Sequence, residues 1–440
     1  MATLHHAIAI VACAGCTGIV SGRSPVDGGI AGPDGAGLDG SLGSSTIPVV
    51  QQTTELCKLL NQTNASDPTP NDVQFRANML GADLGIPVES GDQLFLFFGD
   101  TIGFDGIWGG GQSHPDAVGY AADATTLCNG LGIITLSPAD SIGPTVDSRI
   151  VADFAGGAMV APATGTLDQF IHDPAGTGDQ RFANLPGDFE VPSGAFAYGG
   201  SIYIFYTTVA SETDTTMVGS YLAKWATPTT TDVPSYQILY AVDERADANG
   251  PLFGDFVNVS AEVAGDYVYL FGTGEYRESP IHLARKLLAT LDTPGGFELF
   301  DAASGTWSAN RGAPVVATPG YGETSVHYFA ELGAWMILAE EITATSNRIV
   351  AHFAASPEGP WSDSEPVADM ADAAFRATYC CAVDDDCEAA QFMDCDRTGF
   401  YGSYLLPSVS PEPNGFDVTY TLSSFDPYNV AVFQTRFARY

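Results

Sequence analysis

The stretch GDQLFLFFGDT at residues 91–101 begins with a turn glycine, continues as a run of apolar and aromatic residues, and ends near the carboxylate of Asp100. A short run of this composition bounded by turn residues predicts a β-strand. Later stretches repeat the design: GGSIYIFYTTV (199–209), GDYVYLFGTG (265–274), GAWMILAEE (333–341) and GFDVTYTLSS (415–424). Repetition of one strand design indicates a protein built from similar β-units.

Each of these strands is followed by a second predicted strand with smaller side chains. The second strands are predicted at 116–123, 217–225, 279–286, 347–356 and 429–437. Five units of two to four strands favour an all-β fold, a five-bladed β-propeller, because radial repetition leaves few exposed strand edges. A β-sandwich is the competing interpretation. The best short helix is predicted in TELCKLLNQ (54–62).

The composition supports a β-rich protein and excludes some partners. The 440 residues are 45% hydrophobic and include 49 glycines and 27 prolines but only 16 lysines and arginines. This composition favours a turn-rich β-protein over a helical bundle. The formal net charge of −37 argues against nucleic acids and anionic membrane surfaces as partners, because binding to phosphates needs clustered cations.

The N-terminus resembles an export signal. The apolar segment 7–12 is too short to span a membrane, and it leads into Cys13-Ala14-Gly15-Cys16. This segment resembles a lipoprotein signal (1–16) with Cys16 as the lipidated residue. An ordinary secretory signal is the alternative. Residues 17–50 are rich in glycine, serine and proline and predict a disordered tether. The propeller domain is expected at 51–440, either anchored to the bacterial cell surface or outer membrane or secreted.

Six cysteines remain after Cys16, and an even number in an oxidising compartment indicates disulfides. They are Cys57, Cys128, Cys380, Cys381, Cys387 and Cys395. Their spacing allows many pairings, and the adjacent Cys380 and Cys381 are expected to take different partners. An acidic, cysteine-rich insertion at 379–399 is either a disulfide-closed loop or a structural Ca²⁺ site, although it lacks the EF-hand spacing. Zinc is less favoured, because no histidine is near.

In a propeller, the innermost strand of each blade lines a central channel. The innermost strands are expected about ten residues before the strands quoted above. Their polar residues are Asp83, Glu190, Asn258, Glu262, Glu323 and Tyr404. Carboxylates from different blades would then converge on one axis, and Asp100 would reach the same mouth. Converging carboxylates raise one another's pKa, and such a pair suits acid–base chemistry on a glycosidic bond. The alternative for Asp100 is a structural strand-end turn.

The segments in their order are similar to a known family. GADLGIP with GDQLFLFFGDT, then EVPSGAFAYGGSIYIFYTT, GTGEYRESPIHLA, GYGETSVHYFAELGAWMIL and DPYNVAVFQTRF together resemble the family catalogued as domain of unknown function 4185. The similarity spans roughly residues 71–440. It implies a five-bladed propeller related to the arabinanase and fructosidase propellers. Some members of the family are endo-D-arabinanases of glycoside hydrolase family 183, which cut the D-arabinan of mycobacterial cell walls.

The resemblance implies roles for individual residues. Asp83 in the DLG segment and Asp100 in the GDT segment would be the catalytic pair. The substrate-binding residues would be Glu190, Arg277, Ser279, His282, Glu323 and Tyr404, with Tyr428 as a further stacking surface. Arg277 has an alternative role as the partner of a channel acid, and His282 has an alternative role as a structural residue. His114 on a glycine-rich loop either binds substrate or is solvated.

Two functions follow from these patterns. The first is a surface-anchored or secreted glycoside hydrolase, endo-D-arabinanase-like, acting on an arabinofuranose-type polysaccharide. This chemistry needs no metal or organic cofactor, and a monomer is expected. The second is a noncatalytic surface propeller that binds a glycan or a protein at the mouth of the channel.

Overall fold

The structure is a computed structural model, and it describes part of the chain. The chain divides into residues 1–41 and 42–440, and every described residue belongs to the second part. The described residues are 47–60, 71, 73, 79–103, 116–134, 186, 189–211, 214–231, 236–245, 250–381, 391, 393–396, 398–425 and 427–439. The predicted signal, Cys16, most of the tether, His114 and Cys387 therefore lie outside the described residues.

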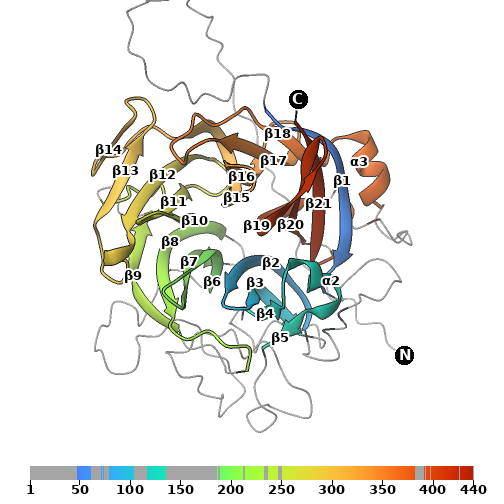
Figure 1. Ribbon diagram of the computed structural model, residues 1–440, viewed down its shortest axis with the longest axis horizontal. Coiled ribbons are helices and arrows are strands. Elements are labelled where there is room, and N and C mark those ends of the chain that lie inside the picture. The colour runs from blue at the N-terminus through green and yellow to red at the C-terminus, as the bar shows by residue number, and fades with distance from the viewer. Residues whose placement is uncertain are drawn as a thin grey trace, which may run out of the picture. The chain divides into compact units, whose positions relative to one another are not determined.

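The described chain forms antiparallel meanders, which confirms the prediction of an all-β fold (Figure 1). The first meander contains β2 (Met79–Ser90), β3 (Gln93–Gly103), β4 (Val118–Ala121) and β5 (Gly132–Ile133). The second contains β6 (Phe189–Tyr198), β7 (Ser201–Ser211), β8 (Asp214–Trp225) and β9 (Tyr236–Glu244).

The third and fourth meanders are joined into one nine-stranded sheet. The third contains β10 (Asn258–Ala264), β11 (Tyr267–Thr273), β12 (Ser279–Leu287), β13 (Phe297–Asp301) and β14 (Thr306–Ser308). The fourth contains β15 (Val316–Phe329), β16 (Ala334–Ile342), β17 (Asn347–Ala354) and β18 (Glu365–Asp369). Only two residue pairs, Ser279 with Tyr321 and Ile281 with Val316, join β12 to β15. The two parts are therefore separate meanders that touch at one edge.

The fifth meander combines the two ends of the described chain. It contains β19 (Phe400–Glu412), β20 (Gly415–Ser424), β21 (Asn429–Ala438) and β1 (Val49–Lys58). The strand β1 pairs with β21 from Val49 opposite Ala438 to Lys58 opposite Ala431. Figure 1 shows the blue β1 beside the red β21. The short helices are η2 (Ala124–Thr126), α2 (Leu127–Gly130), η5 (Leu288–Thr290) and α3 (Ala373–Tyr379).

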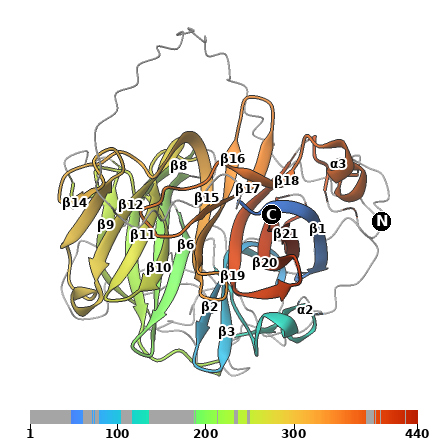
Figure 2. The ribbon, with the colours of Figure 1, turned by 45° about the horizontal axis from the view of Figure 1, so that its top comes forward.

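The first strands of the meanders follow one another in a cycle. Each of β2, β6, β10, β15 and β19 packs against the next, and β19 packs against β2 (Figures 1 and 2). Serine hydroxyls tie several of these strands together by accepting a backbone N–H of the next first strand. The pairs are Ser193 with Val259 at 3.3 Å, Ser260 with Val326 at 3.0 Å and Ser325 with Leu405 at 3.0 Å.

The hydrophobic core lies between neighbouring meanders. Phe95 of the first meander meets Trp225 of the second with ring centroids 5.4 Å apart. Phe353 of the fourth meets Phe437 of the fifth at 5.4 Å. Aromatic pairs of this kind add to the free energy gained by burying apolar area. The aromatic residues that predicted the strands therefore also hold the meanders together.

The prediction of a helix at 54–62 was wrong. Residues up to Lys58 belong to β1, in which exposed positions alternate with partly buried ones from Thr53 to Leu56. Contacts on both sides of β1 favour the strand over a helix. The Thr53 hydroxyl, for example, donates a hydrogen bond to the carbonyl of Val367 on β18 at 2.7 Å. Pairing with β21 on one side and contact with β18 on the other outweigh the local helical pattern, because β-structure depends on its neighbours.

Two disulfides connect described residues. Cys57 of β1 bonds Cys128 of α2, 71 residues away, and so links the fifth meander to the first. Cys380 bonds Cys395, 15 residues away, inside the predicted insertion. Cys381 is also disulfide-bonded, so the adjacent cysteines do take different partners. The prediction of disulfides is confirmed for these residues.

The disulfide between β1 and α2 is expected to stabilise the folded protein by linking the fifth meander to the first. Replacing Cys57 and Cys128 by serine removes a constraint on a 71-residue loop of the unfolded chain, and loop entropy predicts a loss of about 4 kcal/mol. The matched control, Cys380→Ser with Cys395→Ser, opens a 15-residue loop and is expected to cost about 3 kcal/mol. Urea unfolding of both double variants measures the difference. Equal stability of the Cys57/Cys128 variant and the wild type would contradict the expectation.

Candidate functional site

Asp83 lies on β2 at a distorted position. It is paired with Gly99 of β3, and the register slips on both sides of it, between Gly81 and Asp83 and between Leu84 and Ile86. β-Bulges of this kind re-aim side chains at functional sites. Gly99 gives the carboxyl room, because a Cβ at that position would stand 2.5 Å from Asp83 Oδ1. The glycine in FFGDT therefore serves the carboxyl as well as the strand.

The Asp83 carboxyl is buried, with 8% of the residue exposed. Tyr401 of β19 donates its hydroxyl to Asp83 Oδ2 at 2.9 Å, and Tyr428 also donates a hydrogen bond. Burial and then the negative charge of Asp100 raise the pKa of Asp83 to about 8, with a smaller contribution from Glu323. The two tyrosines oppose this rise. Asp83 is thus held protonated at neutral pH beside a second acid.

Asp100 lies within β3, three residues before its end, in an unusual backbone conformation with φ at 22°. Its N–H donates to Asp116 Oδ1 at 3.0 Å, and the next residue, Thr101, accepts the N–H of Ala117 at 3.0 Å. These bonds fix the end of β3 against the segment that leads into β4. A positive φ is uncommon in a residue with a side chain, and it directs the Asp100 carboxyl away from the regular strand path.

A second acidic group lies beside the first. Glu323 of β15 is buried, and its Oε1 accepts the hydroxyl of Tyr276 at 2.8 Å. Glu340 of β16 is fully buried, and its Oε2 lies 2.8 Å from Arg277 Nε. Burial first, and then the charge of Glu323 and a hydrogen bond to it, raise the pKa of Glu340 to about 8, although Arg277 opposes the rise. Arg277 thus has a buried acid, Glu340, as its partner.

Backbone strain collects around these acids. Among the described residues, the non-glycine residues with positive φ are Leu84, Asp100, Phe253 and Arg277. Leu84 follows Asp83 directly, Asp100 is the second acid, and Arg277 contacts Glu340. Such conformations persist only where the surroundings enforce them, and they cluster at functional sites. Three of the four strained residues therefore mark the same region.

Other predicted residues lie at or near this group. Glu190 of β6 and Tyr404 of β19 are buried. Burial, then the charges of Glu323 and Asp83, raise the pKa of the Tyr404 hydroxyl, which places this phenol within the field of both acids. Glu190 and Asp116 both act on the buried Tyr206, so these acids share a neighbour. The charges of Asp100 on β3 and Glu323 on β15 both act on Asp83 of β2, so Asp83 lies within electrostatic reach of carboxyls from two other strands.

Some predicted residues have contacts elsewhere. His282 of β12 is buried 3.8 Å from Asp255, which Arg311 holds in a two-bonded ion pair, and burial lowers the pKa of His282. These contacts are typical of the structural alternative for His282. The Ser279 hydroxyl donates to the carbonyl of Glu275 at 2.9 Å and so closes the turn before β12.

Asn258 and Glu262 of β10 also meet other partners. The Asn258 side chain bonds the sulfur of Met217, and Glu262 pairs with His327 at 2.9 Å. Glu262, His327 and Glu89 line a cavity of about 190 Å³ together with residues from all the first strands. These residues belong to the later halves of β2, β10 and β15, whereas Asp83 and Glu323 precede them on the same strands. The cavity is therefore displaced from Asp83 and Glu323 along the direction of the first strands.

Sequence reasoning missed four residues of the group: Tyr401, Tyr276, Glu340 and Asp116. A signal existed for Glu340, because it is the penultimate residue of GAWMILAEE, as Asp100 is of GDQLFLFFGDT. Tyr276 stands beside Arg277 in the GEYRES segment that was already singled out. No comparable pattern distinguishes Tyr401, whose partner Asp83 is 318 residues away.

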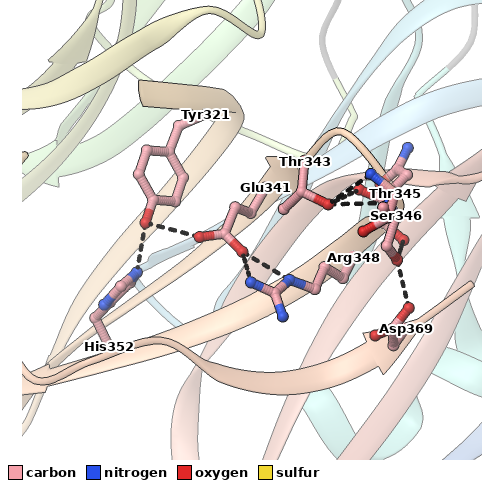
Figure 3. A network of polar contacts seen from close by, with 9 residues as sticks. Tyr321, Glu341, Thr343, Thr345, Ser346, Arg348, His352 and Asp369 are labelled. Carbon is pink, nitrogen blue, oxygen red and sulfur yellow. Dashed lines mark hydrogen bonds and ion pairs between the residues drawn. The ribbon is translucent and has the colours of Figure 1, made fainter. Parts of the chain in front are cut away.

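A neighbouring polar network in the fourth meander differs in kind (Figure 3). Glu341 stands next to Glu340 on β16, but it pairs with Arg348 Nε at 2.7 Å and with Tyr321 at 3.3 Å. His352 Nε2 shares a hydrogen bond of 3.0 Å with the Tyr321 hydroxyl, and burial lowers the pKa of His352. Here each buried charge has its partner inside the meander, which is the pattern of a structural network.

The described part of the chain shows neither a metal-site arrangement nor a membrane-spanning helix. Within it, no group of three His, Cys, Asp or Glu residues has the arrangement of a metal site. The Ca²⁺ hypothesis for 379–399 falls largely on 382–390, outside the described residues. No helix of the described segments has the length and apolarity needed to cross a bilayer.

The buried Asp83 predicts a pH dependence of stability. Its pKa is raised on folding from 3.8 to about 8, so the folded protein binds the proton more tightly than the unfolded chain. The contribution of Asp83 to stability is therefore greatest at low pH and falls as the pH rises from about 4 to about 8. Asp83→Asn keeps the shape without the charge, so the variant should gain stability relative to the wild type as the pH rises through this window. Thermal unfolding of both proteins between pH 5 and 8 measures it, and a constant difference would contradict it.

Comparisons with solved structures place this fold among known ones. A presumed hydrolase from Bacteroides ovatus is 12% identical, with 83% of this chain and 88% of that chain covered and a TM-score of 0.51. An alpha-L-arabinofuranosidase from Podospora anserina in complex with cellotriose is 10% identical over 89% of this chain and 98% of that chain, with a TM-score of 0.44. A mutant alpha-L-arabinanase from Cellvibrio cellulosa is 11% identical over 81% and 91%, with a TM-score of 0.41.

No curated protein sequence matches the chain. At these identities the first of the solved structures supports the fold alone, and the other two carry no weight in the argument. The family model described as Domain of unknown function (DUF4185) matches residues 68–434, which is most of the chain and includes every acid of the group described above. The chain belongs to this family.

Proposed function

We propose that the chain is an exported glycoside hydrolase whose meanders are the blades of a five-bladed β-propeller. Asp83 and Asp100 are its catalytic pair. One observation carries the proposal: Asp83 is buried, its pKa is raised to about 8, and the charge of Asp100 is one of the causes. Hydrolysis of a glycosidic bond needs one carboxyl that donates a proton and a second that is ionised.

The roles follow from the two environments. Asp83 is the general acid, because its neutral form is the favoured one and the hydroxyls of Tyr401 and Tyr428 hold the carboxyl in place. Asp100 is the partner that acts as base or nucleophile. It lies within β3 and is less buried than Asp83. Both roles are thus filled by side chains of the protein, and no cofactor is proposed.

The substrate is a polysaccharide of the arabinofuranose type, and the cleavage is endo-D-arabinanase-like. This part of the proposal rests on the family, some of whose members have that activity. The residues proposed to line the subsites are Glu190, Glu323 and Tyr404, whereas Arg277, Ser279 and His282 each have a partner within the fold. Among them Glu323 and Tyr404 have the most direct support, because both act electrostatically within the acid group.

Export is proposed from the N-terminal sequence and agrees with the disulfides. Bonds such as Cys57–Cys128 persist in oxidising compartments and are rare in the cytosol. Residues 1–16 are the proposed lipoprotein-type signal with Cys16 as the anchor, and 17–50 are the proposed tether. A monomer held by this tether at the cell surface would meet polymeric substrate directly.

Activity should depend on both aspartates. Asp83→Asn and Asp100→Asn should each lower the turnover of a cleaved arabinan by about two to four orders of magnitude, the range expected for loss of a positioned acid or base. The measurement is the release of reducing sugar from mycobacterial arabinogalactan and from other arabinans. The control is Asp123→Asn, which changes an exposed carboxyl that caps η2 and leaves a side chain that also caps helices.

The outcomes separate the two functions. Full activity in both Asp83→Asn and Asp100→Asn would refute the assignment of the pair. Failure of the wild type to release oligosaccharides from any of these glycans would favour the noncatalytic alternative, a propeller that binds a glycan or a protein.

A further inference from the structure

The group around Glu340 holds two buried acids and one cation. Glu340 accepts the side-chain amide of Asn347 at 2.8 Å and pairs with Arg277 at 2.8 Å. Glu323 accepts the Tyr276 hydroxyl and lies close enough to Glu340 for its charge to act there. The two acids and Arg277 therefore form one group.

The surroundings hold Arg277 in one place. Its guanidinium lies over the ring of Tyr276 at 4.5 Å and near the ring of Tyr401 at 5.7 Å. Its backbone is in the left-handed region, with φ at 60°. Gly322 leaves the space, because a Cβ there would stand 2.4 Å from Glu340 Oε2 and 3.2 Å from Arg277 Cγ. The position of Arg277 near both rings thus requires a strained backbone at Arg277 and a glycine at position 322.

The same tyrosine connects the group to Asp83. Tyr401 packs by its ring near Arg277 and donates by its hydroxyl to Asp83 Oδ2 at 2.9 Å. The contact joins the third and fourth meanders, through Arg277 and Glu340, to the fifth and the first. Arg277 is therefore placed to fix the orientation of Tyr401, and Tyr401 to fix the orientation of Asp83.

We propose that Glu323, Glu340 and Arg277 form a positioning cluster that holds Tyr401 against Asp83. Arg277 is then a positioning residue rather than a ligand of an anionic substrate. The inference rests on the proposed function only where it calls Asp83 the general acid.

The groups that face each carboxyl set the expected behaviour. Asp83 faces Asp100, Glu323, Tyr401 and Tyr428. The groups that face Glu340 are Arg277, Glu323 and Asn347. Removal of the Tyr401 hydroxyl takes away a hydrogen bond that favours the ionised form of Asp83. The titration midpoint of Asp83 should then move to higher pH.

The experiment tests whether Arg277 and Tyr401 position Asp83. Carboxyl ¹³C resonances of the aspartates, assigned with Asp83→Asn, give the titration midpoint of Asp83 in the wild type, in Tyr401→Phe and in Arg277→Lys. Tyr401→Phe should raise the midpoint, and Arg277→Lys should raise it less, because an ammonium keeps the charge but loses the planar stacking. Unchanged midpoints in both variants would overturn the positioning role.

Failure of this inference and failure of the proposed function are distinguishable. The titration needs no substrate, so it stays decisive if no glycan is cleaved. If a glycan is cleaved, the alkaline limb of the kcat profile should move to higher pH in Tyr401→Phe along with the NMR midpoint. A limb that stays in place while the midpoint moves would show that Asp83 is positioned as inferred but is not the general acid.

Discussion

The pairing of β1 with β21 is the constraint on which the site depends. It completes the fifth meander with residues from the start of the described chain, and the bond between Cys57 and Cys128 ties that meander to the first. Only when the fifth meander stands against the first can Tyr401 of β19 reach Asp83 of β2, across 318 residues of sequence. The hydrogen bond that orients the acid is thus a consequence of closing the cycle of first strands.

Electrostatics at the site are governed by burial and by a shortage of cations. Burial raises the pKa of Asp83 and of Glu340 to about 8, and in each case the charge of a second acid raises it further. Arg277 is the cation found at this group in the described residues, and Glu340 already engages it. In the adjacent network of Figure 3, by contrast, Glu341 has Arg348 as its own partner. Asp83 and Glu340 thus have raised pKa values, whereas Glu341 has a cation of its own within the fourth meander.

Stabilising devices and strained residues occupy different places. Serine hydroxyls such as those of Ser260 and Ser325 satisfy backbone groups between the first strands, where irregular contacts would otherwise leave donors unpaired. The positive-φ residues gather at the acids instead. Gly99 gives room to the carboxyl of Asp83, and Gly322 gives room to that of Glu340. A side chain at either glycine would therefore displace one of these carboxyl groups. A rigid scaffold thus supports a locally strained group of acids.

The sequence by itself determined the all-β class, the repeated strand design and the disulfide chemistry, because strand composition, turn residues and cysteine number are local signals. It also pointed to Asp83 and Asp100, which lie within electrostatic reach of each other in the structure. It failed at residues 54–62, where pairing with a strand from the other end of the chain replaced a helical pattern. It also missed Tyr401 and Glu340 and left the role of Arg277 open. Only the tertiary structure decided which side chains meet, since partners hundreds of residues apart, and the burial that shifts their pKa values, exist only once the first strands stand side by side.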